Sequence, residues 1–122
     1  MIREEFKEIE VEKLRVSPYN IRERVKPEDV ERLAKSIRER GLINPLTVTY
    51  NEEEDVYEII CGRLRFEAVK KLGWKKVRCK VLYDITPDQA ILLSLAENWE
   101  QHSITEEEAA RAVAKLYSEY GY

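Results

Sequence analysis

The sequence has 122 residues, of which 43% are hydrophobic and 37% are charged, and its formal net charge at pH 7 is -3. A chain of this length fits one domain and can form a single core without disulfide or metal support. The acidic balance excludes a protein that holds nucleic acid by overall positive charge, and no apolar run reaches the roughly 20 residues that a membrane-spanning helix needs.

Basic residues are concentrated in the middle of the chain, between Arg22 and Lys80, whereas residues 97–108 are rich in glutamate. A contact with an anion is therefore expected to use a local patch in the middle of the chain. The two cysteines, Cys61 and Cys79, fall in predicted strands and lack the spacing of a metal site. We predict buried free thiols in a reducing cytoplasm, and the lack of a signal-peptide pattern agrees with a cytoplasmic location.

The first part of the chain predicts a strand, a loop and a helix. Residues 8–14 begin by alternating apolar residues with glutamates, which is typical of a strand with one solvent-exposed face. Residues 17–22 contain proline and asparagine, which favour a loop. A helix is then predicted from Pro27, because proline suits the first turn, and Gly41 ends it as a C-terminal cap.

Three further strands are predicted at residues 46–50, 56–61 and 76–83. The first two are rich in β-branched and apolar residues, and the polar run between them joins them as a hairpin. The third alternates apolar and polar residues. The predicted fold class is α+β, with a small mixed four-stranded sheet and flanking helices, followed by two C-terminal helices.

The two C-terminal helices begin at capping residues. Thr86, followed by a proline, opens a helix that is apolar nearly all round as far as Trp99, so we expect it to be well buried. Thr105 opens the last helix as an N-cap, with Glu108 three residues later completing a capping box. An apolar stripe follows the last helix to its end at Gly121.

The strand at residues 56–61 runs into a helix through Gly62, because apolar residues recur at helical spacing after it. A helix N-terminus carries free N–H groups and a partial positive charge, and here its first turn holds Arg63 and Arg65 where acidic residues are usual. This arrangement suits an anion, most readily a phosphate. The alternative is that Gly62 only makes a tight turn and that both arginines are solvated.

Four segments, in the same order along the chain, resemble the N-terminal domain of the ParB family of DNA-partition proteins. They are residues 17–22 (SPYNIR), residues 31–46 from the first helix to the glycine-to-proline turn, residues 62–68 (GRLRFEA) at the position of the arginine-rich box, and residues 96–98 with 107–110 at the position of the second box. The resemblance implies the ParB/sulfiredoxin-like fold over most of the chain.

In that family the domain is a nucleotide-binding clamp, in which CTP with Mg²⁺ closes a dimer on DNA. The nucleotide-binding residues that the resemblance implies are Gly41, Asn44, Pro45, Gly62, Arg63, Arg65, Glu97 and Asn98. Glu97 and Asn98 would hold the triphosphate and the metal. Asn20 stands where the family has a glutamine implicated in hydrolysis, so Asn20 and Glu97 are the implied catalytic residues of a weak CTPase.

Four positions depart from the fullest form of the family's boxes, the first being Arg63, which stands where the box has a glutamate. Leu64 replaces one arginine, Glu67 replaces another with the opposite charge, and Gln101 stands where an arginine usually follows the glutamate-asparagine pair. Each charged contact contributes roughly 1.5–3 kcal/mol, so these replacements are expected to weaken a triphosphate site.

The predicted organisation is a nucleotide-binding core over residues 1–84 and a helical pair over residues 85–122. No segment predicts a recognition helix with base-reading side chains, so specific readout is expected from a DNA-binding region absent from this chain. The apolar stripe that continues to the end of the last helix favours a fragment of a longer protein. The implied partners are DNA, a ParA-type ATPase and a second copy in a homodimer, at the nucleoid in the cytoplasm.

Other functions fit parts of the sequence. Sulfiredoxin-type chemistry needs a thiolate after the box glycine, but Cys61 precedes that glycine. A phosphotransferase of this fold uses a glutamate in the first loop, where this chain has Asn20 with Glu23 nearby. A nuclease needs clustered carboxylates, for which residues 106–108 are candidates although helix capping explains them. The remaining alternative is an adaptor module whose last two helices dock partners without nucleotide.

Overall fold

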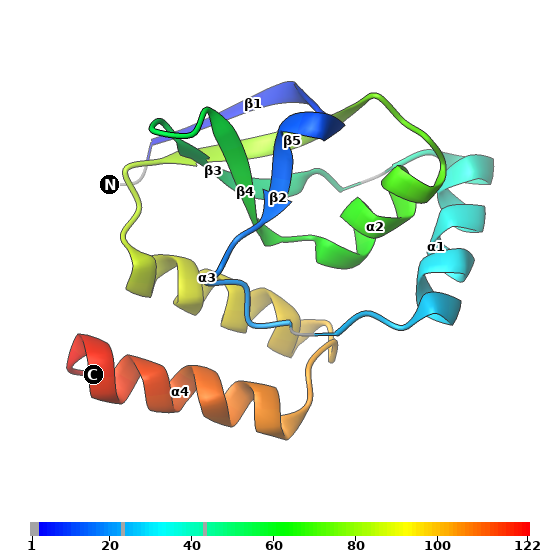
Figure 1. Ribbon diagram of the computed structural model, residues 1–122. Coiled ribbons are helices and arrows are strands. Elements are labelled where there is room, and N and C mark those ends of the chain that lie inside the picture. Colours follow the sequence, from blue (N-terminus) through cyan, green and yellow to red (C-terminus); the bar gives the residue numbers. More distant parts are fainter. Residues whose placement is uncertain (1–2, 23, 43) are drawn as a thin grey trace.

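The computed structural model describes residues 3–22, 24–42 and 44–122 (Figure 1). The strands are β1 (Arg3–Glu10), β2 (Leu14–Val16), β3 (Leu46–Asn51), β4 (Val56–Cys61) and β5 (Lys76–Tyr83), and a short 3-10 helix, η1 (Val11–Lys13), joins the first two. The helices are α1 (Pro27–Arg40), α2 (Arg63–Lys71), α3 (Pro87–Glu100) and α4 (Glu106–Tyr120). The predicted α+β class is confirmed.

The sheet has five strands, so the prediction of four was wrong. The predicted strand at residues 8–14 is divided by η1 into β1 and β2; the Val11 amide still donates to the Lys75 carbonyl at 2.8 Å, next in register after the Glu10–Lys76 pair, and the chain turns away from β5 in η1. The strand order is β1-β5-β3-β4-β2. β1 pairs antiparallel with β5, β3 pairs antiparallel with β4 and parallel with β5, and β2 pairs parallel with β4.

The two pieces of the divided strand lie at opposite edges of the sheet, although only η1 connects them. A flat sheet of this size would place its edge strands about 19 Å apart. The step from Glu10 to Leu14 spans at most about 14 Å. The sheet is therefore strongly curled, and Ile9 of β1 and Leu14 of β2 join the same buried cluster.

Adjacent residues of β4 face opposite sides of the sheet. Ile59 is fully buried in the main core, where Ile37 of α1 and Val69 of α2 belong to the same cluster. Ile60 is also fully buried, but in a second cluster with Ala90 of α3. The sheet thus separates α1 and α2 from α3, and the end of β4 leads directly into α2, with α1 packed on the far side of α2 (Figure 1).

α4 lies on the side of α3 that faces away from the sheet, and it runs antiparallel to α3 (Figure 1). A third cluster joins the two helices to the loop between β2 and α1, through Ile21, Ile91, Ala112 and Leu116. The loop therefore contributes to the packing of the helical pair as well as connecting β2 to α1.

α3, which we expected to be well buried, is buried on one part of its surface and exposed on another. Leu92 is 38% exposed and Trp99 is 60% exposed, because α4 covers only one side of α3. The apolar stripe of α4 is likewise only partly covered, with Val113 at 45% and Tyr117 at 70% exposure. The helical pair therefore presents large apolar side chains to solvent.

The predicted helix ends are confirmed at both C-terminal helices. The Thr86 side chain accepts a hydrogen bond from the Gln89 amide, and the Thr105 side chain accepts one from the Glu108 amide, each within a reciprocal capping box. Gly121, with φ 73°, ends α4. Within the described part of the chain, no helix combines the length and the apolar character that crossing a bilayer requires.

Replacing Ile59 by alanine should lower the free energy of unfolding by about 2–5 kcal/mol, because the lost methyl groups leave a cavity in the main core. Urea denaturation followed by circular dichroism measures the change. Tyr117→Ala is the control, since that side chain is 70% exposed and its loss should change stability by less than about 0.5 kcal/mol. Equal losses in the two variants would contradict the assignment of the core.

Candidate anion-binding site

Gly62 joins β4 to α2 in a left-handed conformation, with φ 98° and ψ 27°. A Cβ atom there would lie 2.8 Å from Cδ2 of Leu46 and 3.2 Å from the Arg65 guanidinium, so the backbone and its neighbours both require glycine. The first turn of α2 has no side-chain cap and no acidic residue. Its N–H groups are therefore available to a bound anion.

A cavity of about 260 Å³ opens beside this helix terminus. Its lining includes six of the predicted residues, namely Asn44, Gly62, Arg63, Arg65, Glu97 and Asn98, together with Arg22, Leu33, Leu64 and Gln101. The structure therefore gathers the turn after α1, the start of α2 and the end of α3 around one space. Leu64 and Gln101, which replace arginines of the family pattern, also face this space.

The Arg65 guanidinium is held on two sides. Its Nη2 donates to Oε1 of Glu97 at 2.7 Å, and its Nη1 lies 3.4 Å from the Asn44 carbonyl oxygen and 3.3 Å from that of Pro45. The Arg65 and Glu97 side chains are only 15% and 25% exposed. Arg65 thus links α2 to α3 and to the turn before β3, while the cavity beside it stays open.

Arg22 is a site residue that the sequence interpretation did not single out. Nε of Arg22 and Nε of Arg63 are both buried and have no hydrogen-bond partner among the described residues, although Nη1 of Arg63 donates to the Arg22 carbonyl oxygen. Burial lowers the pKa of Arg22, and the nearby Arg63 cation lowers it further, against the opposing effect of neighbouring carboxylates. Two buried, unsatisfied guanidinium donors at one cavity indicate a place for an anion.

Arg22 also borders a second cavity, of about 820 Å³, between the loop and the α3–α4 turn. Arg24 and Lys26 line this space, together with acidic residues that include Asp29 and Glu107. Two signals in the sequence pointed to Arg22, its place at the end of the SPYNIR loop and its place at the start of the basic middle stretch of the chain. Its distance from Arg63 in the sequence gave no reason to pair the two.

Glu97 and Asn98 were the predicted metal ligands. Asn98 is 6% exposed; its amide donates to the Ser94 carbonyl at 2.7 Å, and its Oδ1 accepts from the Ser103 hydroxyl at 2.6 Å. Glu97 is the one carboxylate among the described residues that line the 260 Å³ cavity. The described residues contain no group of three or more His, Cys, Asp or Glu able to hold a metal. One carboxylate and one amide oxygen fit Mg²⁺ that is held mainly by phosphates and water.

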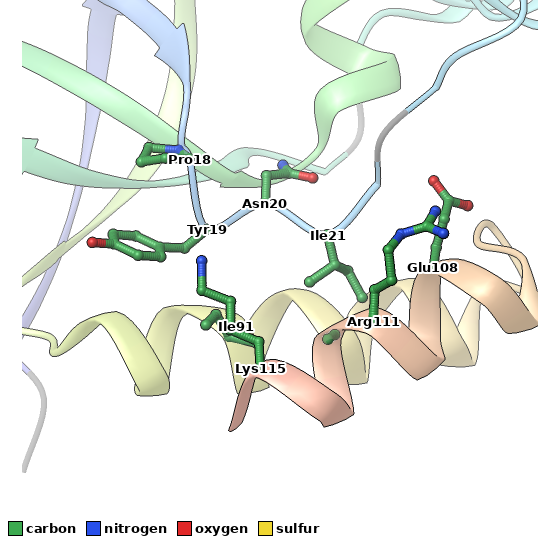
Figure 2. A pocket seen from close by; sticks show the side chains of 9 residues that line it. Pro18, Tyr19, Asn20, Ile21, Ile91, Glu108, Arg111 and Lys115 are labelled. Carbon is green, nitrogen blue, oxygen red and sulfur yellow. The ribbon is translucent and has the colours of Figure 1, made fainter. Parts of the chain in front are cut away.

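Asn20, the predicted catalytic residue, lies outside the described lining of this cavity. Its Nδ2 donates to the carbonyls of Ile59 and Ile60, at 3.2 and 2.9 Å, and its Oδ1 accepts from the Arg22 amide at 3.0 Å. Figure 2 shows the Asn20 side chain pointing away from the helical pair, whereas Ile21 points toward it. Asn20 therefore fixes the loop that carries Arg22.

Several predicted residues remain outside this cluster. Pro45 is absent from the described cavity lining, although its carbonyl oxygen lies 3.3 Å from Nη1 of Arg65. Gly41 ends α1 with φ 81°, and it is absent from the described cavity lining. Glu23, which the phosphotransferase alternative invoked, and Ile43, in the glycine-to-proline turn, lie outside the described residues. Glu108, one of the nuclease candidates, accepts a hydrogen bond from the Thr105 amide at 2.9 Å and caps α4.

Cys61 and Cys79 are buried free thiols, as predicted. Burial raises the pKa of Cys61 far above its ordinary value, and the nearby Glu97 carboxylate adds to the shift. Burial also raises the pKa of Cys79, to about 12. Because a thiol nucleophile must be deprotonated, this environment disfavours sulfiredoxin-type chemistry at Cys61.

Known proteins resemble this chain in sequence. The family model for the ParB N-terminal domain matches residues 2–99. A nucleoid occlusion protein of Oceanobacillus iheyensis is 34% identical over 113 residues, which make up 93% of this chain and 39% of that protein. The chain thus spans well under half the length of this curated relative.

Solved structures resemble it in fold. The C-terminally truncated chromosome-partitioning protein ParB from Caulobacter crescentus, complexed with CTP-gamma-S, has a TM-score of 0.73 and 26% identity, covering 95% of this chain and 64% of that chain. Sulfiredoxin from Arabidopsis thaliana has a TM-score of 0.53 and 32% identity over 63% of this chain and 83% of its own. The predicted ParB/sulfiredoxin-like fold is confirmed.

Gly62→Ala should lower the free energy of unfolding by about 1–3 kcal/mol, because alanine is strained in a left-handed conformation. The collision of the new Cβ with Leu46 should lower it further. Gly73→Ala is the matched control, because Gly73 has φ 75° but nothing within 4 Å of an added Cβ. Urea unfolding of both variants separates backbone strain from collision. If Gly73→Ala were as damaging as Gly62→Ala, close packing at Gly62 would play no part.

Both thiols should resist alkylation in the folded protein. Their raised pKa values keep them protonated between pH 7 and 9, so iodoacetamide should react at least about a hundredfold more slowly than with the urea-unfolded chain. Mass spectrometry of alkylated peptides over this pH range measures the rates. Rapid alkylation of Cys61 in the folded protein at pH 8 would revive the thiol-chemistry alternative.

Proposed function

Because the chain belongs to the ParB N-terminal domain family, we propose that it is the nucleotide-binding part of a ParB-like DNA-partition protein. The curated relatives that it matches are called nucleoid occlusion proteins, and the chain spans 39% of the first of them. Sequence-specific DNA binding is therefore assigned to a region outside these residues, as the sequence analysis expects. A ParA-type ATPase is the proposed motor partner.

One observation carries the nucleotide proposal. The guanidinium groups of Arg22, Arg63 and Arg65 surround a cavity at the uncapped N-terminus of α2, and two of their Nε atoms are buried without a partner. Buried cations with free donors are costly in an empty site and favourable beside phosphate oxygens. A polyphosphate satisfies these donors and the helix N–H groups together.

The proposed ligand is CTP with Mg²⁺. The ParB from Caulobacter crescentus, which is 26% identical to this chain, is described as complexed with CTP-gamma-S. The 260 Å³ cavity is small for a whole nucleotide, and Arg22 also lines the 820 Å³ cavity, which would provide the further space. In this arrangement the turn at Asn44 and Pro45 meets the base and the arginines hold the phosphates.

Glu97 and Asn98 would hold the Mg²⁺, which neutralises phosphate charge when bound. Any hydrolysis is proposed to be slow. The Asn20 amide, the candidate for orienting water, is engaged by three backbone groups, and Leu64 and Gln101 supply no charge where the family pattern has arginines. The chain is therefore proposed to use nucleotide chiefly as a binding signal.

Self-association is proposed for the helical pair, α3 with α4, at residues 85–122, beside a nucleotide-binding core at residues 1–84. Leu92, Trp99, Val113 and Tyr117 expose apolar area on these two helices. Burying such side chains against a second copy would be favourable. The same exposed surface supports the second candidate function, an adaptor module that docks partners without nucleotide.

Arg65→Ala should weaken CTP binding by at least about tenfold, because each charge-assisted hydrogen bond to phosphate contributes roughly 1.5–3 kcal/mol. Calorimetry with CTP, ATP and GTP in Mg²⁺ measures the affinities. Arg38→Ala is the matched control, since Arg38 is exposed on α1 and is absent from the described lining of the cavity. Circular dichroism shows whether each variant is folded.

The adaptor alternative gives a different pattern. If the wild-type chain binds none of the three nucleotides, but associates with increasing concentration in a way that nucleotide does not alter, the nucleotide proposal is overturned. Sedimentation velocity with and without CTP makes this distinction.

A further inference from the structure

The unsatisfied donors around the 260 Å³ cavity are gathered at one place, the turn from β4 into α2. They are the buried Nε atoms of Arg22 and Arg63, which lack a partner among the described residues, and the N–H groups of the uncapped first turn of α2. Nη1 of Arg63 donates to the Arg22 carbonyl oxygen, so these two residues lie beside each other at the helix terminus. The cluster is suited to the oxygens of about two phosphate groups.

The net positive charge of the described lining also lies at this cluster. Arg65 donates to Glu97 at 2.7 Å, so these two residues together are neutral. The Gln101 amide nitrogen lies 3.4 Å from the same carboxylate oxygen and carries no charge. Arg22 and Arg63 are therefore the cations that no lining carboxylate balances among the residues that the structure describes there.

Away from the cluster, one part of the cavity wall is apolar. Leu33 of α1 and Leu64 of α2 both line it. Leu64 directly follows Arg63, so its side chain leaves the helix about 100° further round the axis. A phosphate group placed against these leucines would lose water and gain no hydrogen bond.

The 820 Å³ cavity offers no better place for a further phosphate group. Its lining contains His102, the basic residues Arg22, Arg24, Lys26 and Arg111, and the acidic residues Asp29, Glu107 and Glu108. A phosphate group that enters this space is attracted by the cations and repelled by the carboxylates, so the two effects oppose each other. Recognition of phosphate by unbalanced charge is therefore confined to the cluster at the start of α2.

Resting on the proposed nucleotide-binding function, we infer that this site recognises two phosphate groups of a nucleotide and not a third, and that Leu64 is the residue that determines this specificity. Two phosphate groups satisfy the N–H groups of α2 and the buried arginine donors. A third meets either the leucine wall or the mixed charges of the larger cavity. CDP should therefore bind about as tightly as CTP, and removal of the terminal phosphate would leave a nucleotide that still fills the site.

The test is calorimetric titration of CTP, CDP and CMP, each in Mg²⁺. Wild type should bind CTP and CDP with affinities within about threefold of each other, since the third phosphate gains no charged partner. It should bind CMP at least about tenfold more weakly than CDP, because CMP lacks a phosphate group that the arginine donors recognise. Leu64→Arg should bind CTP at least about tenfold more tightly than CDP, because it places a guanidinium on the apolar wall.

Ser118→Arg is the matched control, since Ser118 is exposed near the end of α4, is absent from the described lining of the cavity, and the substitution adds the same charge. It should keep the wild-type ratio of the CTP and CDP affinities. Circular dichroism shows whether each variant is folded. The wild-type ratio tests the inference even if Leu64→Arg does not fold.

Three outcomes would overturn the inference. They are binding of CTP by wild type more than about threefold tighter than that of CDP, equal binding of CDP and CMP, and a folded Leu64→Arg whose ratio matches that of Ser118→Arg. In each case nucleotide still binds and the proposed function stands. Failure of wild type to bind any of the three nucleotides would instead overturn the proposed function, and this inference with it.

Discussion

The left-handed backbone at Gly62 is the constraint on which the site depends. It turns the chain from β4, which is buried on both faces, directly into α2. An uncapped helix terminus therefore lies at the C-terminal end of this inner strand. A Cβ atom at this position would collide with Leu46 in the core and crowd the Arg65 guanidinium in the site, so any other residue here would disturb both. The fold and the proposed anion binding therefore depend on the same residue, because both need close backbone approach.

Charge at the site is balanced across distant parts of the chain. Arg22 comes from the loop after β2, Arg63 and Arg65 come from α2, and Glu97 comes from α3. With box arginines replaced at positions 64 and 67, Arg22 supplies a cation from outside the box. Glu97, the single carboxylate among the described residues of the lining, offsets one of these charges, which lowers the cost of three neighbouring cations in the absence of a ligand.

The loop between β2 and α1 connects the sheet to the helical pair. Asn20 binds the carbonyl groups at the end of β4, while the Ile21 amide donates to the Ser94 hydroxyl of α3 at 3.1 Å and the Ile21 side chain packs against α4. A ligand that moves Arg22 would therefore affect both ends of this loop. This physical connection supports a proposal in which nucleotide binding and the position of α3 and α4 are linked.

Local sequence determined the helix caps at Thr86 and Thr105, the glycine joint at Gly62 and the arginines beside it, because each depends on neighbours a few residues away. It did not reveal that residues 8–14 divide into two strands at opposite edges of the sheet, since that depends on the curl of the whole sheet. Nor did it show that Arg65 pairs with Glu97, 32 residues away, or that Arg63 reaches Arg22, 41 residues away. Only the tertiary structure decided those contacts, because packing of α2 and α3 around the end of β4 sets which side chains share a cavity.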